Sequence, residues 1–151
     1  MKELRVQPIM NGTVIDHITP GKALKVLHIL GLPKPESTST ISVAINVPGK
    51  TCKKDIVKIE DRELESSEVD RIALIAPNAT INIIRNYDVV EKHRVNIPEE
   101  LIGIVRCSNP TCVTNSTEPV QHRFTVVSKN PLRVKCQYCL REPADIENHI
   151  L

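Results

Sequence analysis

The chain has 151 residues, of which 40% are hydrophobic and 25% charged, and its formal net charge is +2. This composition is typical of a globular protein with room for two small domains. No apolar run approaches the length of a membrane span, and the opening MKELRVQ lacks the apolar core of a signal peptide. We therefore expect a cytoplasmic protein with no membrane partner.

Strands are predicted where β-branched and apolar residues alternate with polar ones. The segments that meet this criterion are residues 4–9, 12–18, 40–47, 54–60, 80–84 and 87–90. The segment 12–18 precedes a proline-containing turn and carries the polar pair Asp16-His17 near its end, so we expect these side chains at a strand end. Pro48-Gly49-Lys50 predicts the turn before segment 54–60.

Two helices are predicted between these strands. The first has Thr19 as N-cap and runs over residues 20–30, with Gly31 closing it. The second has Ser67 as N-cap, with Asp70 three residues later as an imperfect capping box, and it stops before Pro77.

The resulting order is strand, helix, strand, strand, helix, strand, which is a split β-α-β arrangement. The predicted fold class is α+β: a ferredoxin-like antiparallel sheet with both helices on one face, plus a small β-rich zinc domain at the C-terminal end. We expect the domains to be residues 1–97 and 98–151, with residues 92–100 as the hinge. Such a sheet leaves a face and an edge open, often for a second copy of itself.

Four cysteines dominate the C-terminal domain. Cys107 and Cys112 enclose four residues, and Cys136 and Cys139 enclose two, which is the spacing of two metal-binding loops. Two disulfides, an iron centre and four uncoordinated thiols are alternatives, but a closed site in a cytosolic chain favours one structural Zn²⁺. A unit of this size buries little apolar surface, so the metal is expected to supply much of its folding energy.

A zinc-ribbon protein that binds nucleic acid is a second hypothesis, suggested by the cysteines and a pI near 8.3. Four thiolates and one Zn²⁺ add a charge of −2, which cancels the formal +2. The aromatic residues Tyr87, Phe124 and Tyr138 offer little surface for stacking bases. We therefore expect no nucleic-acid partner.

No nucleophile and base occur at diagnostic spacing, so the sequence predicts no enzyme. Gly49-Lys50-Thr51 lacks the first glycine of a phosphate-binding loop. Polar residues do occur at the predicted strand ends, and lysines on neighbouring strands can converge on a polyphosphate. These candidates for an anion site are Asp16, His17, Lys54, Lys58, Asn82 and Lys92.

Several segments together resemble a known family. They are 12–18 (GTVIDHI), 54–60 (KDIVKIE), 76–80 (APNAT) with Asn82, 86–90 (NYDVV) and the four-cysteine tail. In this order, and over essentially the whole chain, they are similar to the regulatory chain of aspartate carbamoyltransferase. The resemblance implies a non-catalytic subunit in pyrimidine biosynthesis, with an effector domain that binds CTP or ATP and a zinc domain that docks on the catalytic chain.

The resemblance also implies assembly and site residues. Regulatory-chain homodimers would bridge catalytic trimers, giving a heterododecamer of two catalytic trimers and three regulatory dimers. By position, Asp16 and Lys58 would contact ribose and base, His17 and Lys92 would hold phosphates, and Asn82 would lie near the triphosphate. The implied base pocket consists of Ile9, Ile84, Tyr87 and Val89.

Overall fold

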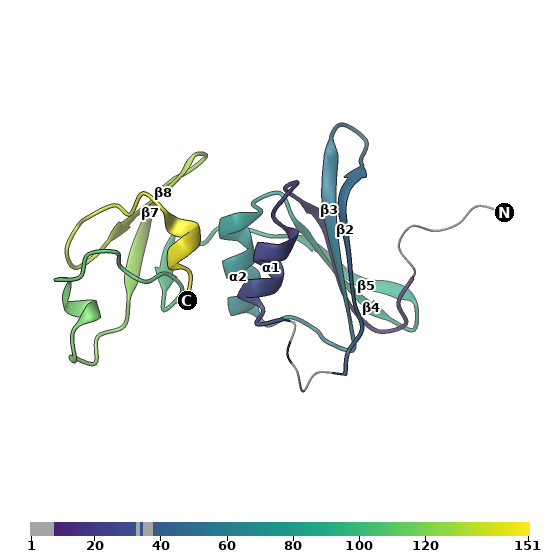
Figure 1. Ribbon diagram of the computed structural model, residues 1–151, viewed down its shortest axis with the longest axis horizontal. Helices are drawn as coiled ribbons and strands as arrows, with labels where there is room; N and C mark the ends of the chain where they lie inside the picture. The colour runs from purple at the N-terminus through teal and green to yellow at the C-terminus, as the bar shows by residue number, and fades with distance from the viewer. Residues whose placement is uncertain (1–7, 33, 35–37) are drawn as a thin grey trace. The chain divides into compact units, whose positions relative to one another are not determined.

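A computed structural model describes residues 8–32, 34 and 38–151 of the chain. The chain divides into two compact units, residues 1–96 and 97–151 (Figure 1). Of the predicted strand at 4–9, residues 4–7 lie outside the described residues, while Pro8 and Ile9 are not in a strand.

The first unit is built on a five-stranded sheet. Its strands are β1 (Gly12–Ile18), β2 (Ile41–Pro48), β3 (Lys53–Glu60), β4 (Thr80–Arg85) and β5 (Asp88–Arg94). They lie in the order β2-β3-β1-β4-β5, and all neighbours are antiparallel. The helices α1 (Ala23–Ile29) and α2 (Ser66–Ile75) lie on the same side of this sheet (Figure 1). The predicted α+β class is therefore confirmed.

Both helices begin at different residues from those predicted. Thr19 is not the N-cap of α1, because residues 19–22 form a turn in which the amide of Lys22 donates to the Thr19 carbonyl at 3.0 Å. Helix α2 begins at Ser66, and its capping box joins Glu65 to Glu68 rather than Ser67 to Asp70. A glutamate can replace serine here because its carboxylate also accepts the amide of the third helical residue.

Alternation along the strands separates a helix-covered face from an open face. Ile15, Val57, Ile59 and Ile81 are fully buried on the covered face. Because successive side chains of a strand point to opposite faces, the residues between them lie on the open face. The open face carries polar side chains, including those of Lys58 and Asn82.

The predicted hinge at 92–100 is wrong at its start, because β5 continues to Arg94. Lys92 pairs with Asn82 and Arg94 with Thr80, and the amide of Val95 then donates to a carbonyl at 3.0 Å. The strand ends before the proline-containing segment, since proline cannot donate to the ladder.

The second unit is a small three-stranded sheet with two short 3₁₀ turns. Its strands β6 (Glu100–Ile102), β7 (Arg123–Lys129) and β8 (Leu132–Cys136) lie in that order, and the turns span Val113–Asn115 and Ile146–His149. Its largest fully buried side chains are those of Leu101, Val105, Phe124 and Val134. None of the helices in the described part of the chain has the length and apolarity needed to cross a bilayer.

Candidate functional site

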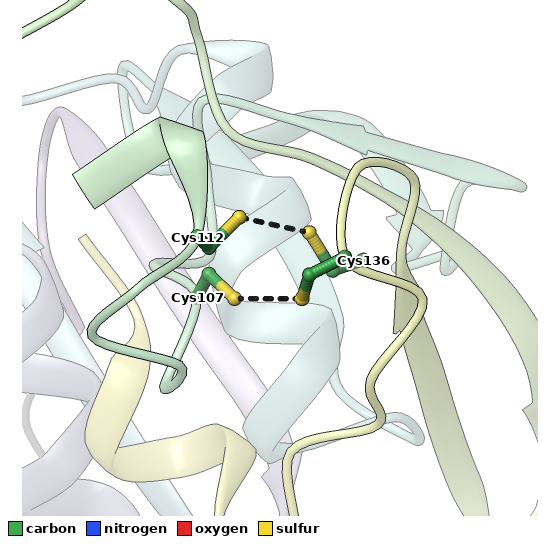
Figure 2. A group of neighbouring side chains, drawn as sticks. Cys107, Cys112 and Cys136 are labelled. Atoms are coloured by element: carbon green, nitrogen blue, oxygen red, sulfur yellow. Dashed lines mark hydrogen bonds between the residues drawn. The ribbon is translucent and has the colours of Figure 1, made fainter. Parts of the chain in front are cut away.

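The four predicted zinc ligands form one cluster in the second unit. Cys107 and Cys112 enclose a loop after β6, while Cys136 ends β8 and Cys139 follows it in a turn. The four sulfur atoms lie within 4.8 Å of one another. Figure 2 shows the side chains of Cys107 and Cys112 pointing toward the facing segment, which carries Cys136 at the end of β8.

The separations of the sulfur atoms fit a tetrahedral zinc ion. Cys107 Sγ lies 3.6 Å from Cys139 Sγ, and Cys112 Sγ lies 3.7 Å from Cys136 Sγ. Four sulfurs about 2.3 Å from a central zinc are about 3.8 Å apart, whereas the sulfurs of a disulfide are about 2.05 Å apart. All cysteines of the chain are free thiols, so the alternative of two disulfides is wrong. The cluster has the donor set of a structural zinc site.

Burial and local amides set the protonation of the ligands in the absence of metal. Burial raises the pKa of Cys107 to about 12. Burial also acts to raise the pKa of Cys139, but hydrogen bonds from the Arg141 amide and the Asn109 side chain outweigh it and lower the pKa to about 6. Because zinc favours thiolates, its binding releases the proton that burial holds on Cys107.

Asn115 holds the first cysteine loop in place. Its Nδ2 donates to the carbonyl of Cys107 at 2.9 Å and to that of Asn109 at 2.7 Å. Thr114 Oγ1 donates to Cys112 Sγ at 3.1 Å. Sequence reasoning missed both residues, although their place just after the second cysteine of a loop is where such supporting contacts occur.

The open face of the first unit aligns three of the predicted effector residues in one row. Val14 of β1 pairs with Lys58 of β3 on one side and with Asn82 of β4 on the other, and Asn82 pairs with Lys92 of β5. Strands lie about 4.8 Å apart, so the row spans three inter-strand steps from Lys58 to Lys92. Asn82 Nδ2 donates to the Val14 carbonyl at 3.3 Å, which fixes the amide between the two lysines.

Asp16 and His17 lie further along β1. Asp16 Oδ1 is 3.0 Å from Lys54 Nζ and accepts the backbone N–H of His17 at 2.7 Å. His17 Nδ1 lies 3.1 Å from Thr80 Oγ1. Burial lowers the pKa of Lys58, while the negative charge of Asp16 acts to raise it. The carboxylate therefore partly offsets the cations of this face.

The predicted base-pocket residues lie toward the other end of the strands. Ile84 pairs with Val89, and the amide of Tyr87 donates to the Met10 carbonyl at 2.9 Å, which places Ile9 close to the β4–β5 turn. Tyr87 and Val89 are more than half exposed, whereas Ile9 and Ile84 are buried. Met10 is also exposed here.

A cationic hollow of about 800 Å³ continues this face beyond Lys92. Its walls include Lys50 from the β2–β3 connection, Lys53 from the start of β3 and Arg94 from the end of β5. Of the residues around this hollow, the sequence interpretation used His17, Lys54 and Lys92 but not Lys50 or Lys53, although the basic residues around the predicted turn were a signal. Sequence reasoning missed Arg94, which lies beyond the predicted end of its strand.

These observations define a two-domain protein, with polar and exposed apolar side chains on the open face of an α+β sheet and the donor set of a zinc site in a separate small domain. The description "Aspartate carbamoyltransferase regulatory chain, allosteric domain" belongs to the family model that matches residues 4–96. The model of the metal binding domain of the same regulatory chain matches residues 99–147.

Curated relatives agree with both matches. The aspartate carbamoyltransferase regulatory chain of Methanothermobacter thermautotrophicus is 56% identical over 149 residues, which cover 97% of this chain and 94% of that protein. That of Pyrococcus horikoshii is 55% identical over 142 residues, which cover 93% of each chain. This chain belongs to the family of aspartate carbamoyltransferase regulatory chains. It is thus a non-catalytic chain with an allosteric domain and a zinc domain, and its role is in the regulation of pyrimidine biosynthesis.

Proposed function

We propose that the N-terminal domain, residues 1–97, binds CTP and ATP at one shared site on the open face of its sheet. The observation that carries this proposal is the row in which Asn82 stands between Lys58 and Lys92. Lysines on separate strands supply positive charge to a polyphosphate from two sides. His17 and Lys92 take phosphates in this proposal, and the Asp16 carboxylate accepts from ribose hydroxyls.

The base occupies the end of the face near the β4–β5 turn. Tyr87 and Val89 present exposed apolar side chains there, and the buried Ile9 and Ile84 lie beneath the surface. Backbone groups of this turn are available to read the exocyclic amine that both bases carry. Since the shared triphosphate supplies most of the binding energy, discrimination between the two nucleotides is modest.

Calorimetric titration of the zinc-loaded chain with CTP and ATP at physiological salt tests this proposal. We expect saturable binding of both nucleotides with mutual competition, and a loss of at least tenfold in affinity in Lys58→Ala and in Lys92→Ala. Lys129→Ala in β7 of the zinc domain is the matched control, because it removes the same charge elsewhere. Unchanged titrations in both site variants would remove these lysines from the site, and tight binding of single-stranded RNA without nucleotide binding would overturn the proposal.

The zinc domain, residues 98–151, docks on the catalytic chain in this proposal. Three exposed apolar side chains adjoin zinc ligands in the sequence: Val113 follows Cys112, while Tyr138 and Leu140 flank Cys139. Leu140 is 61% exposed and has a φ of +64°, a conformation that disfavours a leucine side chain. An exposed apolar residue held in this way suits a contact with an apolar surface of another chain.

Leu140→Asn tests docking without disturbing the metal, because asparagine tolerates a positive φ. We expect this variant to retain one zinc per chain but to co-purify poorly with the catalytic chain. Val127→Thr is the control, since Val127 is also an exposed apolar residue, but it lies in β7. Undiminished co-purification of Leu140→Asn would place the docking surface elsewhere.

We also propose that the chain forms regulatory homodimers. Three of these dimers would join two catalytic trimers in a heterododecamer. The edge strand β2 supports a contact between regulatory chains, because Val43 and Ile45 are exposed along it. An uncovered edge of this kind is a template for pairing with a second copy. Light scattering of the regulatory chain alone is expected to give the mass of a dimer. Light scattering of regulatory and catalytic chains mixed together is expected to give the mass of the dodecamer. A monomer at all concentrations would contradict the first expectation.

A further inference from the structure

The two strands beside β3 both carry a bulge at the same level of the sheet. The ladder is interrupted over residues 16–17 of β1 and over residues 45–46 of β2. Each bulge contains a residue with a left-handed backbone, because φ is +57° at His17 and +60° at Asn46. A bulge adds one residue to a strand and bends it, so its conformation depends on the contacts that hold the extra residue.

Asp55 of β3 bonds to one bulge and to the segment that follows the other. Its Oδ1 accepts the backbone N–H of Asn46, and its Oδ2 accepts those of Gly21 and Ala23 in the turn after β1. Ile18, the residue after the β1 bulge, is its partner in the β1–β3 ladder. Because the carboxylate is fully buried, an acceptor oxygen left without a donor is costly. A shift of either segment is therefore opposed by the bonds to the other.

The bulge of β1 belongs to the proposed effector site. Asp16 accepts the backbone N–H of His17 and pairs through its carboxylate with Lys54, the residue next to Asp55. A nucleotide that contacts Asp16 and His17 therefore acts directly on the conformation of this bulge. Asn46 does not line the cationic hollow, so an effect of the nucleotide on Asn46 has to pass through the sheet.

The bulge of β2 lies on the edge along which regulatory chains are proposed to pair. Ile45 belongs to this bulge and is 48% exposed, and Val43 is 37% exposed two residues earlier. An extra residue interrupts the alternation of side chains between the two faces, so the bulge decides on which face of the edge Ile45 stands. A second chain that pairs along β2 therefore fits one conformation of the bulge, the one that Asp55 holds.

We propose that Asp55 couples the effector site to the β2 edge, so that nucleotide binding strengthens the pairing of two regulatory chains. The inference rests on the effector site and the homodimer proposed above, and it names the residue that links them. A nucleotide fixes the β1 bulge and the turn after it, and Asp55 then holds Asn46 in the conformation that pairs. Linkage is reciprocal, so pairing strengthens nucleotide binding by the same factor.

Dilution of the zinc-loaded chain, followed by analytical ultracentrifugation with and without saturating CTP, measures the coupling. We expect CTP to lower the dissociation constant of the dimer at least fivefold in the original chain and less than twofold in Asp55→Asn. Asparagine keeps the volume and one acceptor oxygen, so the variant loses the link with little change of shape.

Thr13→Val is the matched control. Thr13 is also fully buried, and its hydroxyl donates to the Arg62 carbonyl at 2.6 Å near the start of β1, away from both bulges. The variant loses a buried hydrogen bond but is expected to keep the full effect of CTP on the dimer. A merely structural role of Asp55 would make the two variants behave alike.

Amide hydrogen exchange gives a second readout that needs no variant. In the original chain, at a concentration where it is dimeric throughout, CTP is expected to slow exchange of the Asn46 amide at least fivefold. The amide of Val126 in the zinc domain is the reference and is expected to be unaffected. Unchanged exchange at Asn46 contradicts the coupling even if Asp55→Asn fails to fold.

The outcomes separate the coupling from the proposals on which it rests. Saturable CTP binding without an effect on the dimer overturns the coupling and leaves the effector site standing. An undiminished effect in Asp55→Asn, or an equal loss in Thr13→Val, also overturns it. Absence of nucleotide binding overturns the effector site as well, and a chain that stays monomeric with and without CTP overturns the homodimer.

Discussion

The carboxylate of Asp55 accepts the backbone N–H of Asn46 at 2.9 Å, which fixes the edge strand β2 at its bulge. The other oxygen of Asp55 accepts the amides of Gly21 at 2.9 Å and of Ala23 at 3.2 Å, at the start of α1. Asp55 is fully buried and thus joins β2, β3 and α1. The turn before α1 and the β2–β3 connection both line the cationic hollow, so this one side chain holds two of its walls.

Asp55→Ala is expected to lower the free energy of unfolding of the N-terminal domain by about 3 kcal/mol, because three amides lose their acceptor. Asp55→Asn keeps the shape and one acceptor oxygen, so a smaller loss is expected. Urea unfolding followed by circular dichroism, with zinc in excess, measures both. Asp88→Ala is the control, because Asp88 is exposed in β5. A loss below about 0.5 kcal/mol for Asp55→Ala would contradict this role of the carboxylate.

Asp55 also illustrates which features of the fold could not be predicted from local sequence patterns. Strands were predictable because their pattern has a period of two, and the cysteine cluster was predictable because ligand spacing reflects metal geometry. The start of α1 could not be predicted in this way. The amide of Ala23 donates to Asp55, which lies 32 positions further along the chain, and no local pattern reveals such a partner. For the same reason the full extent of the hollow escaped prediction, because Lys50 and Arg94 come to line it together only after the sheet has formed.

We predict that effector binding depends on pH because Lys58 titrates. Burial lowers its pKa from the usual value, so the unliganded protein disfavours the charged form, whereas an anionic nucleotide at the proposed effector site would favour it and raise the pKa. Affinity is therefore expected to fall as pH rises through the lowered pKa, by up to tenfold per pH unit, until the pKa of the complex is reached. Titrations across the alkaline range measure this.

Lys58→Arg is the matched control for this prediction, because arginine stays protonated over the whole range. In this variant the fall in affinity with rising pH is expected to be shallower, because position 58 no longer releases a proton over this range. An identical pH profile in the original chain and in Lys58→Arg would assign the dependence to other groups.

Removal of zinc is expected to unfold the C-terminal domain. Its small core and four clustered thiols leave it dependent on the metal, and structural zinc contributes on the order of 10 kcal/mol at neutral pH. Cys136→Ser or a strong chelator should therefore abolish the near-ultraviolet signal of Tyr138 and the co-purification of the catalytic chain. Zinc affinity should also fall as pH decreases, since all four ligands bind as thiolates. A folded, docking-competent Cys136→Ser chain would contradict the structural role of the metal.

Asn115 is expected to support zinc binding without touching the ion. Its side chain donates to two carbonyls of the first cysteine loop, those of Cys107 and Asn109. Asn115→Leu keeps a similar volume but removes both donors, so the loop loses the contacts that pre-organise two of the four sulfurs. Competition with a chromogenic chelator is expected to show zinc affinity about 10- to 100-fold weaker. The control is Asn148→Leu, because Asn148 lies in the second 3₁₀ turn and donates to Asp145 rather than to the cysteine loop. Equal affinities for Asn115→Leu and the control would show that the cysteines alone define the site.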